Sequence, residues 1–188
     1  MIMSKIVCIF SSPRADGNSC TIGRAVLDGA MGLSVNTIKI HRLNSLFTAK
    51  GCQNCDRCRD NYHCYIEDDM KPILEDIVEC DSLVVCFPLF FNGPCAQFKL
   101  LMDRMYSQMT TDLKPRFPGK KLVMVITHDD PDSDEQAKLV EDQLSSIFVD
   151  KLGYDVVGVV NYRCNRDFNS AKHDQIVMNV ARELGKKI

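Results

Sequence analysis

Four cysteines lie within one short polar segment of the chain, which runs from residue 51 to residue 64 and reads GCQNCDRCRDNYHC. They are Cys52, Cys55, Cys58 and Cys64, so their spacing is C-x2-C-x2-C-x5-C. Thiolates this close in sequence can converge on an iron–sulfur cluster without a preformed secondary structure. Because the chain contains no second cysteine run, Cys64 is the natural fourth ligand if a four-iron cluster binds here.

Two other interpretations of this cysteine segment remain open. Structural zinc sites more often use two ligand pairs separated by a longer stretch, which is missing here, but four thiolates also accept zinc. The cysteines can also be free or disulfide-forming thiols. Arg57, Arg59 and His63 lie within the segment, and their charge would partly offset that of a cluster. The other six cysteines are scattered, and Cys8 and Cys86 are expected in the core because they lie in apolar runs.

A second segment, SSPRADGNSCT at residues 11–21, has the chemistry of a phosphate site. Its hydroxyl and amide side chains belong to Ser11, Ser12, Asn18, Ser19 and Thr21. Gly17 allows a tight turn, and the helix predicted after it would direct free N–H groups and the positive end of its dipole at the loop. With one arginine, Arg14, the loop suits a terminal phosphomonoester such as that of FMN. The alternative is a polar loop with an ordinary helix cap.

Two better-known phosphate loops do not match residues 11–21. The segment lacks the lysine of the GxxxxGK[ST] loop, and it lacks the GxGxxG spacing of the dinucleotide-binding fingerprint. A mononucleotide is therefore favoured over a nucleoside triphosphate or a dinucleotide at this loop.

The elements that must position these segments follow from the hydrophobic pattern. Apolar runs at 6–10, 83–87, 122–126 and 156–160 predict strands buried on both faces, as in a parallel sheet. The mixed run at 35–40 predicts an edge strand. Helical periodicity fills the intervals, so strands and helices alternate. This alternation predicts a three-layer, doubly wound α/β fold with a five-stranded parallel sheet in the order 2-1-3-4-5. The phosphate loop then follows the first strand, where such folds bind ligands.

Length and composition bound the remaining possibilities. A chain of 188 residues is expected to form a single domain, 1–188, with the cysteine-rich loop at about 44–67 as an insertion. The formal net charge of −2 argues against nucleic acid or an anionic membrane as a main partner. No apolar run reaches the length of a membrane span, and the short N-terminal run predicts a strand rather than a signal peptide. The expected location is therefore the reducing cytoplasm, where clustered cysteines more often bind metal or do redox work.

Three motifs carry a resemblance to a known family. The phosphate loop SSPRADGNS resembles the GSPRxxGNS signature of the flavodoxin-like NAD(P)H-dependent FMN reductase family. CFPLFFNGPCAQFKLLMDR, at residues 86–104, is similar to the second signature of that family. The cysteine segment, with EDDM at 67–70 after it, resembles the iron–sulfur flavoprotein branch. Together these motifs span about residues 4–130.

The resemblance implies FMN contacts in three loops. Around the flavin phosphate it places Ser12, Arg14, Gly17, Asn18 and Ser19. Along the flavin ring it places Pro88, Leu89, Phe90, Phe91, Asn92 and Gly93, although the two phenylalanines can instead belong to the core. In the third loop it places Thr127 and His128. The chain departs from the family pattern at Ser11, where glycine is usual, at Phe90, where tyrosine is common, and in the third loop, which reads THDDPD.

The resemblance also implies a function. It indicates an FMN-dependent oxidoreductase or electron-transfer flavoprotein with a [4Fe–4S] cluster on the four segment cysteines and no catalytic side chain of its own. NAD(P)H or an electron-carrier protein such as ferredoxin would supply electrons to a small-molecule redox substrate, in a homodimer or homotetramer. One alternative is a flavin-only NAD(P)H-dependent FMN or quinone reductase with non-ligating cysteines. Another is a non-catalytic electron carrier or redox sensor.

Overall fold

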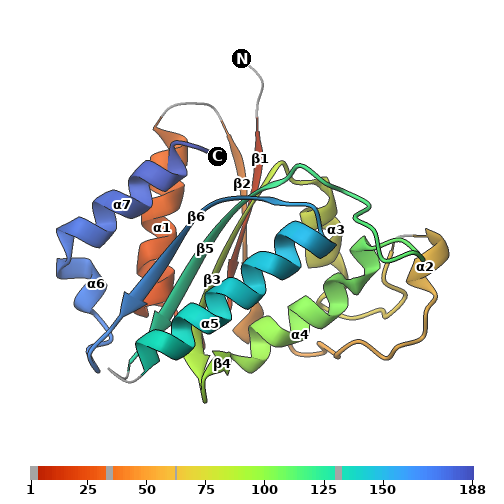
Figure 1. Cartoon of the computed structure of the whole chain (residues 1–188), viewed down its shortest axis with the longest axis horizontal. Helices are drawn as coiled ribbons and strands as arrows, with labels where there is room; N and C mark the ends of the chain where they lie inside the picture. Colours follow the sequence, from red (N-terminus) through yellow and green to blue (C-terminus); the bar gives the residue numbers. More distant parts are fainter. Residues whose placement is uncertain (1–3, 33–35, 62, 130–132) are drawn as a thin grey trace.

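The computed structural model describes residues 4–32, 36–61, 63–129 and 133–188. Its parallel sheet has the order β2-β1-β3-β5-β6, as Figure 1 shows. The strands are β1 (Lys5–Phe10), β2 (Thr37–Arg42), β3 (Ser82–Phe90), β5 (Lys121–His128) and β6 (Asp155–Arg163). This confirms the predicted fold and strand order. The sixth strand, β4 (Gly93–Pro94), was not predicted, because two residues are too short to leave a hydrophobic pattern.

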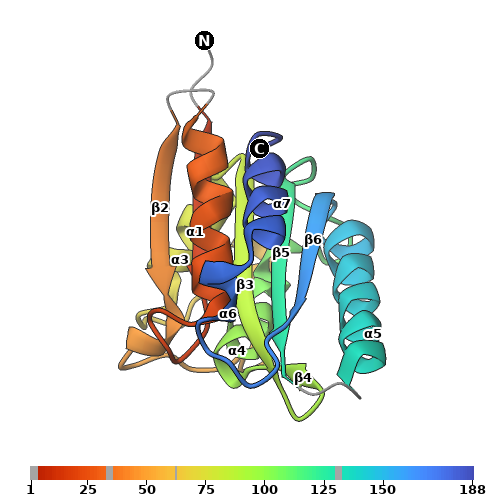
Figure 2. The ribbon, with the colours of Figure 1, turned by 90° about the vertical axis from the view of Figure 1, so that its left-hand side faces the viewer.

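Helices cover both faces of the sheet, which accounts for the apolar runs in its strands (Figure 2). On one face lie α1 (Asn18–Met31), α6 (Ser170–His173) and α7 (Gln175–Gly185). On the other lie α3 (Lys71–Glu79), α4 (Ala96–Arg104) and α5 (Ser133–Ser146). Side chains of β1 alternate between the two cores, as the pleat of a strand requires: Val7 and Ile9 face the α3–α5 side, and Ile6, Cys8 and Phe10 face α1 and α7.

The central strands β1, β3 and β5 are buried and β2 is a half-exposed edge strand, as the sequence predicts. The prediction that the run 156–160 is buried on both faces is wrong, because β6 is the opposite edge strand of the sheet and is mostly only half-buried. Cys8 and Cys86 are fully buried core residues, which is also as expected. Short irregular helices complete the chain: η1 (Leu43–Ser45), α2 (Cys58–Asn61), η2 (Met105–Gln108) and the π-helical turn η3 (Ile147–Lys151). Among the described residues, no helix combines the length and apolar character that crossing a membrane requires.

Helices α1 and α7 approach each other backbone to backbone. A Cβ atom on Gly29 of α1 would lie 2.0 Å from the carbonyl oxygen of Arg182, and one on Gly185 of α7 would lie 1.9 Å from that of Val26. Only glycine fits at such a crossing. This contact seats α7 beside α1 and thereby places the segment between β6 and α7 next to the phosphate loop.

We predict that Gly29→Ala lowers the free energy of unfolding by about 1–3 kcal/mol, because the new methyl group pushes the helices apart. Urea denaturation measures this. Gly32→Ala is the matched control, since Gly32 has a helical φ of −71° and the nearest contact of its added Cβ within the described chain is the Gly29 carbonyl oxygen at 3.6 Å. Helix propensity alone favours alanine at both positions. A Gly29→Ala variant as stable as the control would contradict the proposed close packing.

Candidate functional site

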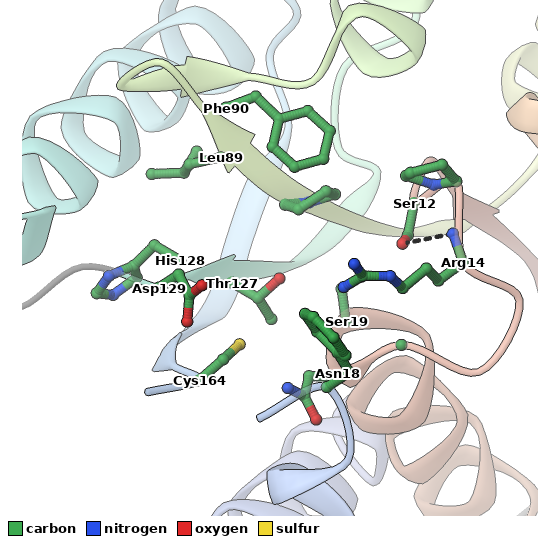
Figure 3. A pocket seen from close by; sticks show the side chains of 14 residues that line it. Ser12, Arg14, Asn18, Ser19, Leu89, Phe90, Thr127, His128, Asp129 and Cys164 are labelled. Carbon is green, nitrogen blue, oxygen red and sulfur yellow. Dashed lines mark hydrogen bonds between the residues drawn. The ribbon is translucent and has the colours of Figure 1, made fainter. Parts of the chain in front are cut away.

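A cavity of about 170 Å³ lies at the carboxyl ends of β1, β3, β5 and β6 (Figure 3). This is the edge of a doubly wound sheet where ligands bind. Its lining residues are Ser12, Pro13, Arg14, Gly17, Asn18, Ser19, Pro88, Leu89, Phe90, Thr127, His128, Asp129, Cys164 and Phe168. The three predicted loops therefore converge, and the segment after β6 joins them.

The phosphate loop ends in a helix start that is open to an anion. Gly17 occupies the N-cap position of α1 with extended backbone angles, φ −69° and ψ 166°, and it offers no side chain to the first-turn N–H groups. Those groups have no intrahelical acceptor, so they and the helix dipole attract negative charge. Ser12 and Ser19 are buried beside this helix start. The Ser12 hydroxyl accepts a hydrogen bond from the Arg14 N–H at 3.1 Å, which tightens the turn.

Arg14 is the cation of the cavity. Its guanidinium extends toward Thr127 in Figure 3 and stacks on the ring of Phe168, with 3.4 Å from Cζ to the ring centroid. Two further arginines hold the loop from behind, because Arg24 of α1 and Arg42 of β2 both donate to the carbonyl oxygen of Ala15, at 2.9 and 2.8 Å. The loop is therefore fixed by long-range contacts and carries a local positive charge.

Asn18 has a role that its position in the motif did not suggest. Its amide donates to the carbonyl oxygen of Asp167 at 2.6 Å and accepts from the N–H of Ala171 at 3.0 Å. These bonds fasten the segment after β6 to the start of α1. Asn18 lines the cavity, but much of its hydrogen-bonding capacity serves this connection, so direct contact with a phosphate stays a prediction.

The second loop is a β-hairpin finger. β3 continues to Phe90, and Gly93–Pro94 pair back on it, with Phe91 and Asn92 at the tip in the left-handed region at φ 49° and 60°. Pro88, Leu89 and Phe90 line the cavity, whereas Phe91, Asn92 and Gly93 do not. The core alternative for the phenylalanines is wrong, because Phe90 is half exposed and Phe91 fully exposed.

The third loop contributes Thr127, His128 and Asp129 to the cavity lining. Thr127 and His128 were predicted at this site. His128 is buried, and its Nε2 lies 3.7 Å from a carboxylate oxygen of Asp134, so the ring is directed toward α5. Asp130 lies outside the described residues. Whether Thr127 and His128 touch a flavin stays a prediction.

Sequence reasoning missed the residues that β6 brings to the cavity. Cys164 directly follows β6, and Phe168 lies in the turn beyond it. Burial is the main cause that raises the pKa of the Cys164 thiol. The available signal was topological: the fifth parallel strand must also end at this edge, so residues just after it were candidates.

The four segment cysteines gather around a second, small cavity of about 20 Å³. Cys52 and Cys55 are exposed, whereas Cys58 and Cys64 are partly buried. Burial and then the nearby Cys64 raise the pKa of Cys58, which reflects how close the thiols lie. Asn54 and Asp56, between the first three cysteines, adopt left-handed angles that curl the chain around the cavity. Among the described residues, no three metal-binding side chains stand in a metal-ready arrangement.

A buried arginine organises this segment. The side chains of Arg104, at the end of α4, and Asp68 are almost fully buried and form an ion pair with 2.7 Å between Nη1 and Oδ2. Burial by itself raises the pKa of Asp68, but hydrogen bonds from Arg104 and from the Lys50 N–H outweigh it and hold that pKa below its usual value.

This chain resembles known proteins both in its sequence and in its structure. A family model described as NADPH-dependent FMN reductase matches residues 4–173. An iron–sulfur flavoprotein of Methanocaldococcus jannaschii is 32% identical over 100 residues, and one of Methanosarcina thermophila is 34% identical over 100 residues. Each match covers 53% of this chain and 51% of the relative, so the chain spans about half the length of these relatives.

Solved structures show the same fold at low identity. An NAD(P)H:quinone oxidoreductase from Methanothermobacter marburgensis superimposes with a TM-score of 0.73 at 18% identity, covering 99% of this chain and 97% of that one. An FMN-dependent NADH-azoreductase from Bacillus anthracis, in complex with FMN, gives 0.72 at 14% identity, covering 98% and 99%. These likenesses establish the flavodoxin-like fold.

We predict that Asp68→Asn lowers the free energy of unfolding by about 3 kcal/mol at neutral pH, because it leaves the buried Arg104 charge without its counterion. The pKa of Asp68 is depressed in the folded state, so this contribution is present above the unfolded pKa of about 4 and fades as pH falls below it. Chemical denaturation of wild type and variant across pH measures the difference.

The matched control is Asp103→Asn, which removes the neighbouring but half-exposed pair between Lys99 and Asp103. Such a surface pair contributes at most about 1 kcal/mol. Two results would contradict the role assigned to Asp68. One is an equal loss of unfolding free energy in the two variants. The other is a stability difference between wild type and Asp68→Asn that grows toward acid pH.

Proposed function

The chain belongs to the NADPH-dependent FMN reductase family, and from this premise we propose that it is an FMN-dependent oxidoreductase that carries a [4Fe–4S] cluster on Cys52, Cys55, Cys58 and Cys64. The observation that carries the flavin part is the cavity at the carboxyl edge of the sheet, in which an uncapped helix start and Arg14 lie opposite the apolar wall of the finger.

The cavity suits the two chemically different ends of FMN. Ser12, Ser19 and the first-turn N–H groups of α1 can donate hydrogen bonds to a phosphate, and Arg14 supplies the opposite charge. Leu89 and Phe90 offer the ring an apolar wall. When bound, FMN supplies hydride and single-electron chemistry, while the protein binds, orients and shields it.

The cysteine segment suits a cluster by its donor set and by the cations around it. Four thiols and Arg104 line one small cavity, and Arg59 and Arg116 contact residues that line it. Arg104 donates to the Cys64 sulfur at 3.1 Å, Arg116 donates to the carbonyl oxygens of Cys58 and Arg59, and Arg59 reaches the hydroxyl of Tyr106. Positive charge and N–H donors favour a negatively charged iron–sulfur group. The names of the curated relatives support the same proposal.

A flavin-only NAD(P)H-dependent FMN or quinone reductase is the second candidate. It is favoured by the observation that the four thiols do not stand in a metal-ready arrangement in the described part of the chain. Zinc at the same thiols and a non-catalytic carrier or redox sensor are the remaining alternatives. The experiments below separate these possibilities.

The surrounding biochemistry is proposed on the same basis. The chain acts as one domain, 1–188, that takes electrons from NAD(P)H or from a carrier protein such as ferredoxin and passes them to a small-molecule redox substrate. It assembles as a homodimer or homotetramer. We propose the reducing cytoplasm as its location, because clustered cysteines there more often bind metal or do redox work.

We predict that Arg14→Gln weakens FMN binding roughly tenfold, because it removes a charged hydrogen-bond donor worth about 1.5 kcal/mol. Fluorescence titration of flavin-free protein measures the Kd. Riboflavin, which lacks the phosphate, should bind wild type and Arg14→Gln equally. Arg182→Gln on α7, outside the cavity lining, is the matched control. Unchanged FMN binding, or an equal loss for riboflavin, would overturn the placement of the phosphate.

We predict that protein purified without oxygen contains about four irons per chain, with broad visible absorption that dithionite bleaches. Cys58→Ala should lose this iron and keep its FMN. Cys80→Ala, which removes a buried cysteine at the end of α3, should keep both. Wild type with FMN and no iron would favour the flavin-only reductase. Bound zinc would favour a zinc site at the same four thiols. A failure to bind FMN would overturn the whole assignment.

A further inference from the structure

Arg104 uses its whole side chain to hold the cysteine segment. Each of its five N–H donors has an acceptor: Nε donates to the Cys64 sulfur, Nη1 to Lys50 O and Asp68 Oδ2, and Nη2 to Ile66 O and Asp68 Oδ1. The distances lie between 2.7 and 3.3 Å. A lysine has no planar fork, so it cannot reproduce this set.

These acceptors flank the cysteine segment on both sides. Lys50 precedes Cys52, whereas Ile66 and Asp68 follow Cys64. One guanidinium therefore closes the base of the loop, and it does so from the end of α4, a helix anchored in the core by Phe98 and Leu101. Arg116 holds a different part of the segment through the backbone of α2.

Cys64 differs from the other three segment cysteines in its surroundings. It packs against the hydrophobic core, and its sulfur accepts the Nε–H hydrogen bond of a buried cation. Cys52 and Cys55 are exposed, and Cys58 lies in the short helix α2. The segment thus has one sulfur fixed by the fold, while the others lie on chain that has fewer contacts with the core.

We propose that Arg104 is a positioning residue for the cluster, which presets Cys64 as the first ligand and donates an N–H hydrogen bond to that ligand's sulfur. This rests on the proposed cluster. A hydrogen bond to a ligand sulfur stabilises the more negative, reduced state, so Arg104 raises the reduction potential of the cluster. It also slows loss of iron, because the other three sulfurs close on a ligand that is already in place.

The test compares Arg104→Lys with wild type by anaerobic redox titration followed by EPR. At a fixed potential near the wild-type midpoint, we expect the ratio of reduced to oxidised cluster to fall about tenfold in Arg104→Lys, which is 59 mV for one electron. Iron should also leave the variant faster when a chelator is added. Arg182→Lys is the matched control, because Arg182 lies on α7, bonds Asn179 outside the segment and should leave the reduction potential unchanged.

A second measurement needs no substitution at the buried arginine. Wild type grown with arginine labelled with ¹⁵N only at Nε should show hyperfine coupling between the reduced cluster and that nitrogen in pulsed EPR. Asp68→Asn should keep the coupling, since the Nε–H bond does not involve Asp68. Wild type without iron would overturn the cluster and this inference together. Wild type with about four irons, but with no coupling or with an unchanged potential in Arg104→Lys, would overturn this inference alone.

Discussion

The buried ion pair between Arg104 and Asp68 is the constraint on which the cysteine half of the molecule depends. Withdrawing two charges from water is costly, and the attraction between them offsets this only if the remaining donors and acceptors are satisfied. Here they are: the guanidinium also bonds Lys50 O, Ile66 O and the Cys64 sulfur. The pair therefore explains how the stretch between η1 and α3, whose described residues include only the short helix α2, can keep a defined shape. It also dictates where the cysteines stand, because both ends of their segment are tied to one side chain.

Helix α4 connects the two candidate sites. It begins just after the finger that lines the flavin cavity and ends at Arg104, so it spans about 13 Å at 1.5 Å per residue. The stack of Phe98 on Phe87, with ring centroids 4.1 Å apart and planes within 6°, seats the helix on β3, the strand that forms the finger. A shift of β3 relative to α4 would therefore disturb the cavity wall and the base of the cysteine segment together. The two sites are therefore connected through the packing of α4 on β3.

The features that the sequence predicted depend on local patterns. The features that it missed depend on contacts between residues far apart in the chain. The strands and their order follow from local apolar runs and from the rules of parallel sheets, and ten of the thirteen proposed flavin residues line the cavity because they sit at strand ends or at a helix start. The contacts made by Asn18, Phe168 and Arg104 depend instead on partners far away in the chain, which no local pattern reveals. The finger was missed for a related reason. A two-residue turn with φ above zero normally calls for asparagine and glycine, and Phe91 gives no such signal.

Placement of charge matters more here than its total. The chain has 23 basic and 25 acidic residues, which leaves a net charge close to zero. Yet guanidinium groups gather where small anions are proposed to bind: Arg14, Arg24 and Arg42 at the phosphate loop, and Arg59, Arg104 and Arg116 at the cysteine segment. Arginine suits both places because its charge persists on burial and its fork can hold backbone carbonyls while it faces an anion. The same side chains thus shape each loop and set the electrostatic potential around it. A substitution at any of them should therefore alter geometry and electrostatics together. Conservative replacements that separate the two effects are consequently more informative than alanine.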